Sequence, residues 1–415
     1  MKKTIILLSI CFYAVFAMAQ QKIEFVEPFL EQTFQGISAP LGKILACPAT
    51  KKDSTNAYGL YDYSDCMIYG FSHTLYSDSN SVSPCDLIIT PTMLDKNMLS
   101  YSFYFQHQNE NAKVGYYSIK ADNGLLCELT ATENFACHKY TFPDDNRLMA
   151  VIIDLNNNNL TWKTETKSMT SLLGSCFSTD YNEEQQLYFA LKFSKNVQKI
   201  YNDKKNGKLY IFFGRSSKDN NIIEVQVAMS FKNKDDATKK LKNKTAENFI
   251  ETRKESEISW EKFLNTVEVE NATKEQQISF YTAMYFSMSP KNQNKQQPIH
   301  QPLTDVLNAL GLSPINHPKS VLDVFDALGL SPDNEFKITT PLFEKATINL
   351  GDNKKFVIIS KQGKQYSKNK IVKLNGKVYK KSYISQEEIL KGGTLEIINA
   401  EGYARDFGFS IRSKE

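Results

Sequence analysis

Residues 115–132 read GYYSIKADNGLLCELTAT, and this stretch decides the fold class of the chain. Tyr, Ile, Leu and Thr favour strands, whereas the Asp-Asn-Gly at 122–124 favours a tight turn between two strands. Similar segments follow on both sides, separated by turn clusters at 144–146 and 156–159. Strands this short and this regularly spaced predict an antiparallel β-sandwich between residues 23 and 231. The predicted strands are 87–90, 99–106, 115–120, 125–132, 138–142, 149–155, 186–193, 208–213 and 222–231.

The hydrophobic period changes after residue 235. Residues 245–264 place apolar side chains at helical spacing among Glu and Lys, which predicts an amphipathic helix. A second helix is predicted from Thr273 until Pro290 and the polar residues 291–297 end it. The apolar sets are Phe249, Ile250, Trp260, Phe263 and Leu264 in the first helix, and Ile278, Tyr281, Met284, Tyr285 and Met288 in the second.

An internal repeat follows these helices. Residues 305–316, DVLNALGLSPIN, recur as residues 323–334, DVFDALGLSPDN. Two copies are fewer than a solenoid needs, so a local duplication of one helix end is the simpler interpretation. Strands then resume, with tight turns at 375–376 (Asn-Gly) and 392–393 (Gly-Gly). The predicted strands are 346–349, 355–360, 371–374 and 395–398.

The predicted fold is therefore mainly β, with an N-terminal antiparallel β-sandwich, a short helical connector and a small C-terminal β unit. The chain opens with two lysines, an apolar run at 5–16 and Ala-Met-Ala at 17–19, which together indicate an export signal. A secreted or periplasmic location is expected. The predicted segments are a signal peptide at 1–19, the sandwich at 20–235, the connector at 236–334 and the C-terminal β unit at 335–415.

Composition argues against several classes of partner. Loss of Lys2 and Lys3 with the signal peptide lowers the net charge from +4 to about +2. A nearly neutral chain with mixed charges predicts no binding to nucleic acid or to an anionic membrane. The basic runs 232–244 and 361–381 alternate with polar residues, as exposed strands and turns do. After the predicted signal peptide the sequence contains no uninterrupted run of about 18 apolar residues, so no membrane span is predicted.

Six cysteines follow the signal peptide. They contain no Cys-x-x-Cys and no neighbouring histidine pair, so their spacing predicts no metal site. In an exported protein a disulfide between Cys127 and Cys137 is one interpretation, and buried free thiols are the other. The six are Cys47, Cys66, Cys85, Cys127, Cys137 and Cys176.

Several blocks of the sequence resemble one enzyme family. Near the N-terminus residues 59–65 read GLYDYSD and residues 68–74 read IYGFSHT; near the C-terminus residues 323–332 read DVFDALGLSP and residues 341–348 read PLFEKATI. These blocks resemble glycoside hydrolase family 92, the calcium-dependent exo-acting α-mannosidases common in Bacteroidetes. Ordered matches cover roughly residues 24–290 and 320–400, including an E-x-A-x-x-G-Y-Y segment at 110–117.

The resemblance implies a sandwich packed against an (α/α)6 barrel, with mannose bound on a calcium ion at their junction. The resemblance also implies that residues of the barrel supply the catalytic acid and base. Inverting hydrolysis needs these two carboxyl groups about 6.5–9.5 Å apart. The calcium ion needs several oxygen ligands in addition. Twelve helices of about 11 residues with connections of about 4 need on the order of 180 residues. Roughly 55 residues separate Tyr281 from Phe336. The catalytic barrel is therefore predicted to be missing.

The catalytic base is also predicted to be missing. In the family a Gly-Asn-Asp-Asp-like motif stands about a dozen residues before the Ala-Leu-Gly motif. Here a Pro-Ile pair at 314–315 holds that place before Ala327, and a Gln-Gln pair at 296–297 holds it before Ala309. We predict no catalytic residues, no metal ligands and no cofactor in this chain, although calcium belongs to the intact family.

By the same resemblance one part of the sandwich still reaches the sugar, and Phe71, Ser72, His73 and Thr74 are predicted substrate contacts. The family continues with a Ser-Gly-x-Gly turn, whereas residues 77–80 read SDSN. Because glycine reaches backbone angles that other residues avoid, the shape of this loop is expected to differ. The alternative for His73 is a structural histidine, hydrogen-bonded at a strand end.

Other candidate site residues have weaker support. His107 and His138 are predicted core or sheet residues. Four aspartates near His73 could form a different calcium or catalytic site, but their spacing matches no calcium loop and surface acids are usually solvated. These are Asp62, Asp65, Asp78 and Asp86.

The leading prediction is an exported, catalytically incomplete relative of the α-1,2-mannosidases, whose substrate class is α-linked mannose of glycans or mannan. The alternative is a non-catalytic carbohydrate-binding or scaffold protein of a glycan-degrading system. A third hypothesis supplies the barrel from a separate chain. The sandwich face and the helix at 281–288 that would meet the barrel are expected to be exposed and apolar, which predicts a protein partner or self-association there.

Overall fold

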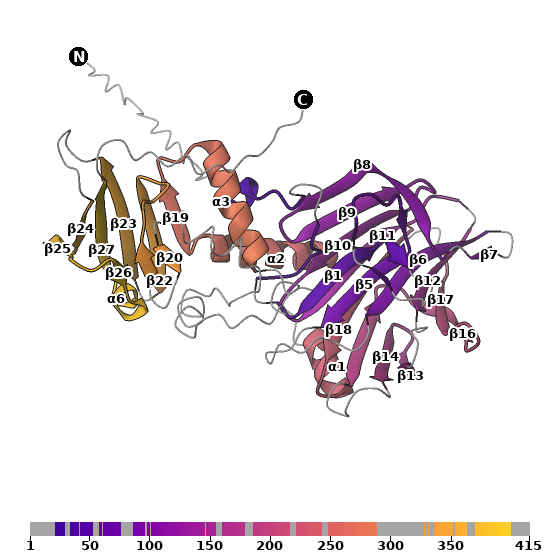
Figure 1. The fold of residues 1–415 in the computed structure, drawn as a ribbon. Coiled ribbons are helices and arrows are strands. Elements are labelled where there is room, and N and C mark those ends of the chain that lie inside the picture. The colour runs from indigo at the N-terminus through magenta and orange to yellow at the C-terminus, as the bar shows by residue number, and fades with distance from the viewer. Residues whose placement is uncertain are drawn as a thin grey trace, which may run out of the picture.

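Figure 1 shows a large sandwich joined through helices to a smaller β unit in the computed structural model. Among the described residues no helix is long and apolar enough to cross a membrane. The predicted signal peptide, Asp78, Cys85, the turn at 77–80 and nearly all of the internal repeat lie outside the described residues. Described are residues 21–29, 34–40, 42–52, 58–59, 61–75, 86–95, 98–99, 101–145, 147–154, 160–178, 186–215, 221–242, 248–288, 328, 330–332, 336–351, 353–362 and 370–399.

Two antiparallel sheets form the sandwich. The first has the strand order β1-β5-β6-β12-β17-β16, with β7 beside β6, and the second has the order β13-β14-β15-β18-β11-β10-β9-β8-β4. The first sheet comprises β1 (Ile44–Ala49), β5 (Gly70–Leu75), β6 (Leu87–Asp95), β7 (Met98–Leu99), β12 (Leu148–Asp154), β16 (Val197–Asp203) and β17 (Lys208–Phe213). The second comprises β4 (Met67–Ile68), β8 (Phe103–Lys113), β9 (Tyr116–Ala121), β10 (Leu126–Ala131), β11 (Phe135–Thr141), β13 (Leu160–Ser168), β14 (Ser171–Ser178), β15 (Leu187–Phe193) and β18 (Ile222–Ser230). A separate short ribbon pairs β2 (Lys51–Lys52) with β3 (Tyr58–Gly59).

Alternation along the strands builds the core between the sheets. Met149, Val151 and Ile153 of β12 belong to the same buried cluster as Tyr117 of β9 and Tyr140 of β11, which come from the other sheet. Burial of this apolar surface is the main term that stabilises the sandwich. The prediction of a mainly β chain is confirmed.

Helices connect the sandwich to the C-terminal β unit. Asn248 and Thr273 cap the two predicted helices, since the side chain of each accepts a hydrogen bond from a backbone N–H in the first turn. Part of the basic run predicted as strands and turns is a helix instead, because Ala237 and Leu241 pack onto the outer face of the second sheet. The helices are η1 (Lys22–Phe25), α1 (Lys234–Lys242), α2 (Phe249–Leu264), α3 (Lys274–Ser287) and α6 (Gln386–Leu390).

A six-stranded sheet forms the C-terminal β unit, in the order β19-β22-β23-β27-β24-β25. Its first strand, β19, comes from the segment between α2 and α3. Asn375 and Gly376 both have positive φ, 51° and 78°, as the predicted tight turn requires. The strands are β19 (Val267–Glu270), β22 (Lys345–Gly351), β23 (Lys354–Gln362), β24 (Ile371–Leu374), β25 (Lys377–Val378) and β27 (Gly393–Asn399). A three-stranded sheet beside it contains β20 (Leu330–Pro332), β21 (Phe336–Ile338) and β26 (Tyr383–Ile384).

The apolar side of α3 is buried, so the expectation that it lies exposed is wrong. Tyr281 and Met284 are 1% and 0% exposed. The Tyr281 hydroxyl donates to the carbonyl oxygen of Val267 at 3.2 Å, and the Phe280 ring lies 5.2 Å from that of Phe343. The helix therefore shares one core with the C-terminal β unit.

Of the two interpretations left open for Cys127 and Cys137, the structure shows buried free thiols and not a disulfide. In the register of β10 and β11, Cys127 lies opposite Tyr140 and Cys137 lies opposite Thr130. Cys127 belongs to the core between the sheets, whereas Cys137 belongs to the cluster beneath α1 on the other face. Neighbours on opposite faces of a sheet cannot be bridged.

Helix α2 packs closely against the backbone of Gly115, which lies between β8 and β9. This residue has a φ of +67°, and a Cβ built on it would lie 3.1 Å from Ser256 Cβ and closer still to Ser256 Oγ. Among the described residues Ser256 Oγ has no hydrogen-bond partner. The indole N–H of Trp260, one turn further along α2, donates to the carbonyl oxygen of Ser38 at 3.0 Å. Gly115 is therefore required both for its backbone angle and for the helix contact.

The substitution Gly115→Ala should lower the free energy of unfolding by about 2–4 kcal/mol, because it adds backbone strain to a steric clash. Gly376→Ala is the matched control, since its φ is +78° but no atom lies within 4 Å of the added Cβ; it should cost about 1 kcal/mol. Adding Ser256→Ala to Gly115→Ala should recover part of the loss. Urea denaturation measures all three, and equal losses at the two glycines would contradict the close approach.

Candidate functional site

The predicted substrate contacts lie on β5, between β1 and β6. Phe71 and His73 are both 0% exposed and face the sandwich core, while Ser72 and Thr74 are 1% and 6% exposed. The Thr74 hydroxyl donates to a carboxylate oxygen of Asp86 at 2.6 Å. The structure thus brings the four residues together along one strand but covers their side chains. Their role as sugar contacts stays a prediction.

His73 joins the two sheets through a hydrogen bond to His138 of β11, with 2.7 Å between their Nε2 atoms. His73 Nδ1 lies 2.9 Å from the carbonyl oxygen of Leu87 and must donate to it. The Tyr140 hydroxyl lies 2.6 Å from His138 Nδ1. One arrangement satisfies every contact with neutral rings: Tyr140 donates to His138 Nδ1, His138 Nε2 donates to His73 Nε2, and His73 Nδ1 donates to Leu87.

Burial keeps both imidazoles neutral. It lowers the pKa of His73 to about 4, against the smaller opposing effect of the backbone contacts. Burial also holds the pKa of His138 well below its usual range, and a charge on His73 would lower it further. The pKa of such a histidine is lower in the folded chain than in the unfolded chain, where it is near 6.5. Its contribution to stability is therefore fully present above pH 6.5, and it is lost as the pH falls from 6.5 toward the folded pKa.

The substitution His73→Gln should remove one of these titrations while keeping a side chain that can donate and accept. Between pH 6 and pH 4.5 the wild-type free energy of unfolding should fall relative to the variant by about 1.4 kcal/mol per pH unit. Chemical denaturation at stepped pH measures both profiles.

Their difference isolates His73, because Asp86 acts in both proteins. Burial raises the pKa of Asp86 to about 6, so its own contribution to stability has the opposite sign in this pH range. Parallel profiles would mean that His73 is already protonated in the folded chain, which would contradict the neutral hydrogen-bond chain.

A second polar cluster brings the 59–65 block against the 110–117 block. The Tyr61 hydroxyl and His107 Nδ1 both contact Oε2 of Glu110, at 2.9 and 2.6 Å. The Tyr117 hydroxyl donates to Oε1 of Glu110 at 2.6 Å. The Tyr63 ring stacks on His107 with 4.0 Å between ring centres. The two blocks quoted for the resemblance therefore meet at one carboxylate.

This cluster, which sequence reasoning missed, orients a histidine. The Glu110 side chain is 2% exposed, whereas His107 is 27% exposed. His107 lies on β8, in agreement with its prediction as a core or sheet residue. Because Nδ1 faces the carboxylate, Nε2 is the ring nitrogen left for other contacts. Burial, followed by the charge of Glu110, raises the pKa values of Tyr61 and Tyr117, so both remain neutral donors. The arrangement resembles the base-orienting half of a catalytic triad.

The aspartates weighed as an alternative site have local partners. Asp62 accepts hydrogen bonds from Lys51 and from the backbone and hydroxyl of Ser64. Asp65 accepts one from Thr50 at 2.8 Å. Across the described residues no group of three or more His, Cys, Asp and Glu side chains is arranged to hold a metal ion. The donor set in this part of the chain therefore does not fit a calcium ion.

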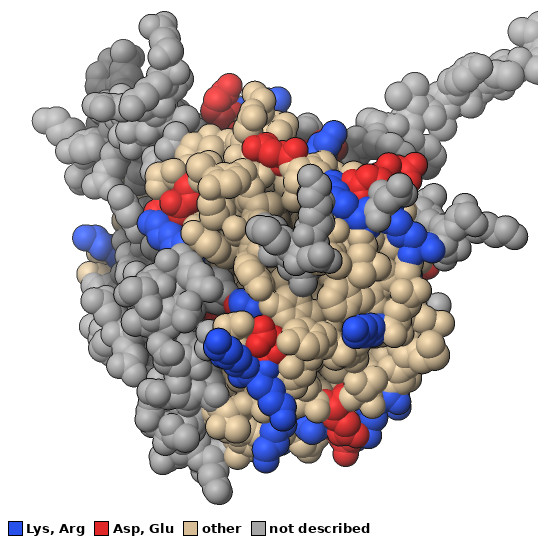
Figure 2. Space-filling model, turned by 90° about the vertical axis from the view of Figure 1, so that its right-hand side faces the viewer, with Lys and Arg blue, Asp and Glu red and all other residues tan. Residues whose placement is uncertain are grey.

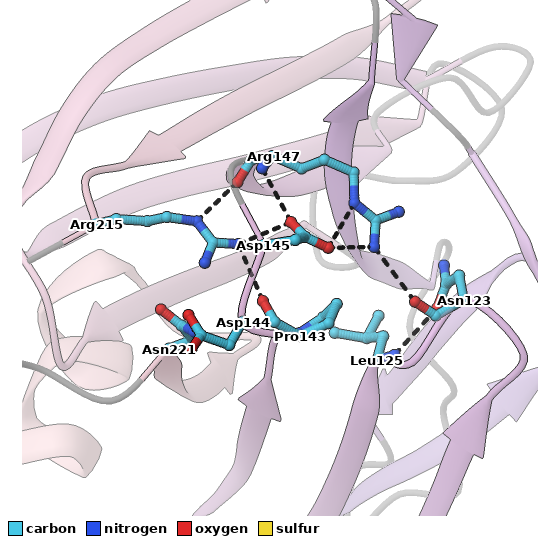
Figure 3. A network of polar contacts seen from close by, with 8 residues as sticks. All are labelled: Asn123, Leu125, Pro143, Asp144, Asp145, Arg147, Arg215 and Asn221. Carbon is cyan, nitrogen blue, oxygen red and sulfur yellow. Dashed lines mark hydrogen bonds and ion pairs between the residues drawn. The ribbon is translucent and has the colours of Figure 1, made fainter. Parts of the chain in front are cut away.

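Figure 3 shows a third network, in which Asp145 lies between two arginines. Arg147 donates to one carboxylate oxygen at 2.8 and 2.5 Å, and Arg215 donates to the other at 3.2 Å. Arg215 also donates to the carbonyl oxygens of Arg147 and Pro143. Hydrogen bonds from Arg147 are the main cause that lowers the pKa of Asp145. A carboxylate held ionised in this way cannot serve as a general acid. Both of its oxygens are bonded to arginines, so we interpret the network as structural.

A cavity of about 620 Å³ lies between α1 and the strands β14 and β15. Its lining includes Lys167, Lys192 and Lys242 together with Asp235. Three lysines and one carboxylate suit an anionic group, and the lining lacks the pair of carboxyl groups that inverting hydrolysis requires.

Comparison with known proteins identifies the family. Residues 24–247 match the model of the glycosyl hydrolase family 92 N-terminal domain. Residues 236–305 and 320–399 match the family 92 catalytic domain. A protein of the fungus Arthroderma benhamiae, described as an uncharacterized secreted glycosidase, is 22% identical over 317 residues. That match covers 65% of this chain, which spans 41% of the length of the fungal protein.

Two solved structures from Bacteroides thetaiotaomicron share the fold. The family GH92 inverting mannosidase BT2199 has a TM-score of 0.69 and 14% identity, with 91% of this chain and 96% of that chain covered. The family GH92 α-mannosidase BT3965 has a TM-score of 0.70 and 13% identity, with 92% and 96% covered. Since the match to the N-terminal domain alone spans more than half of the sequence, the chain belongs to glycosyl hydrolase family 92.

Proposed function

We propose that this chain is an exported, non-hydrolytic member of the family, related by descent to enzymes that act on α-linked mannose. The observation that carries the proposal is the length of the helical part. Helix α3 ends at Ser287, and β20 begins at Leu330. The interval is roughly 40 residues, whereas twelve barrel helices with their connections need on the order of 180.

The state of the buried carboxylates supports the same proposal. Glu128 accepts a hydrogen bond from the Tyr116 hydroxyl at 2.9 Å and pairs with Lys139 at 2.8 Å. Asp154 pairs with Lys208, and Glu110 is engaged through both oxygens. A general acid must release a proton to the leaving oxygen, which a carboxylate already paired with cations or donors does poorly.

The substrate class and the location are part of the proposal. An α-linked mannose glycan is supported by the family and by the two mannosidase folds. Secretion is supported by the leader at 1–19 and by the description of the fungal relative as secreted. We also propose the division into a sandwich at 20–235, a connector at 236–334 and a C-terminal β unit at 335–415, with β19 extending the last of these.

Glycan binding without cleavage is the second candidate function. It is favoured by a cluster of three tyrosines on the outer side of the first sheet, two of which are exposed, described below. The predicted contacts Phe71, Ser72, His73 and Thr74 remain an alternative binding location, which requires exposure of side chains that the sandwich core now covers. A barrel supplied by a partner chain is less favoured, because α3 is already buried against the C-terminal β unit.

Release of mannose from α-1,2-mannobiose tests the proposal. The mature chain should release none above the rate in buffer, with calcium or with EDTA, because the proposal leaves it without an acid and a base at inverting distance. The α-mannosidase BT3965 from Bacteroides thetaiotaomicron serves as the positive control in the same buffer.

Calcium-dependent release of mannose would contradict the proposal. In that case Glu110→Gln and Asp145→Asn should be compared, because the first alters the oriented His107 and the second alters the structural network. Loss of turnover in Glu110→Gln alone would locate an unforeseen active site at the second cluster.

A further inference from the structure

The outer face of the first sheet carries two neighbouring rows of polar and aromatic residues. In one row Tyr201 of β16 lies opposite Tyr210 of β17. In the next row Asp203 of β16 lies opposite Lys208 of β17, which lies opposite Asp154 of β12. Residues two apart on a strand share a face. This face points away from the sandwich core, because the core contains the alternate residues of β17: Leu209, Ile211 and Phe213.

Tyr101, which precedes β8, joins Tyr201 and Tyr210 to form what we call the tyrosine platform. The ring centres of Tyr101 and Tyr201 lie 6.4 and 5.8 Å from that of Tyr210. Tyr210 is 3% exposed, whereas Tyr101 and Tyr201 are 46% and 53% exposed. A buried central ring therefore supports two outer rings that face solvent.

Hydrogen bonding leaves the platform with a donor on its surface. The Tyr210 hydroxyl donates to the Tyr101 hydroxyl at 3.0 Å, so Tyr101 keeps its own O–H proton for another acceptor. Burial, followed by the contact with Tyr101, raises the pKa of Tyr210, and Tyr210 stays protonated in this role. The platform thus combines aromatic faces with a phenolic donor and acceptor.

An ion pair fixes Tyr101 from below. The side chains of Lys208 and Asp154 are 11% and 3% exposed and pair with each other. Lys208 Nζ lies 4.9 Å from the centre of the Tyr101 ring, which is a cation–π distance. Burying an ion pair carries a desolvation cost that apolar side chains would avoid. Apolar side chains could therefore support the half-exposed Tyr101 ring with a smaller loss of free energy. An ion pair that fixes the orientation of Tyr101 before a ligand arrives lowers the entropy lost on binding, which would offset this cost.

The chemistry of the platform suits a sugar better than a protein. A stable protein interface buries about 800 Å² on each partner, and two half-exposed rings offer far less. Figure 2 shows the side of the molecule that carries β16 and β17, where uncharged residues predominate among the described ones and charged residues of both signs are scattered between them. A pyranose presents an apolar C–H face to an aromatic ring and hydroxyls to its edge, so small amphipathic tyrosine sites match it.

We propose that the tyrosine platform is a binding site for the pyranose rings of an α-mannose glycan, separate from the strand β5 on which sugar contacts were predicted. The choice of mannose rests on the proposed function; the choice of a pyranose rests on the platform itself. A sugar ring stacks on Tyr201 and its hydroxyls bond to the Tyr101 hydroxyl. Asp203 lies on the same face, with its carboxylate held by the backbone and side chain of Asn206.

Affinity electrophoresis in gels that contain yeast α-mannan tests the platform with the full mature chain. The wild type should be retarded, and Tyr201→Ala and Tyr101→Ala should each weaken binding by about 3- to 10-fold. Tyr201→Phe should bind like the wild type, because the stacking face remains, whereas Tyr101→Phe should bind like Tyr101→Ala, because the hydroxyl is lost.

Tyr104→Ala is the matched control, since Tyr104 is 57% exposed but lies on β8 of the other sheet. Unfolding midpoints confirm that each variant is folded. Wild-type mobility that mannan leaves unchanged would overturn the proposal, as would equal losses in the Tyr104 and Tyr201 variants. Mannose release, assayed separately, reports on the proposed function: turnover would overturn that function, whereas variant-specific loss of retardation would support the platform with or without turnover.

Discussion

The contact of α2 with the sandwich is the constraint on which the rest of the structure depends. Gly115 lets the helix approach, and Trp260 then fills the space between Ser38, Phe263 and Tyr285. From the same helix Glu261 accepts hydrogen bonds from the backbone of η1, and the segment after it bonds to β22 through Asn349. A single buried cluster thereby links the N-terminal segment, both long helices and the C-terminal β unit.

This shared core bears on the proposal that the chain lacks the barrel of its family. A sandwich cut away from its barrel would expose the helix face that met it, and an exposed apolar face invites association. Here α3 buries that face against residues of the C-terminal β unit, which also takes β19 from the connector. The chain therefore closes its own core around α2 and α3, and the proposed absence of hydrolysis rests on the short interval between α3 and β20.

The sequence was sufficient for elements with strong local patterns. The predicted strands between residues 87 and 231, the two capped helices and the Asn375-Gly376 turn are found in the structure, because each is specified by neighbouring residues. Strands β1, β5, β13, β14 and β16 were not predicted. Helix α1 was missed, since it buries little beyond Ala237 and Leu241 among many lysines. The His73–His138 pair, the Glu110 cluster and the tyrosine platform join residues distant in sequence, and only strand pairing and the packing of the two sheets bring them together. The register of β10 and β11 places Cys127 and Cys137 on opposite faces.

Hydrogen exchange at the backbone amides of α3 tests the central claim most directly, because the claim is that this helix is buried within the chain itself. Amides of Lys274–Ser287 should exchange as slowly as those of β23 and β27, since one core protects all three elements. An isolated helix of 14 residues is marginal in water. Exchange of the α3 amides as fast as those of an isolated helix would contradict the account. The apolar side of α3 would then be exposed, as expected for a helix that normally packs against a barrel.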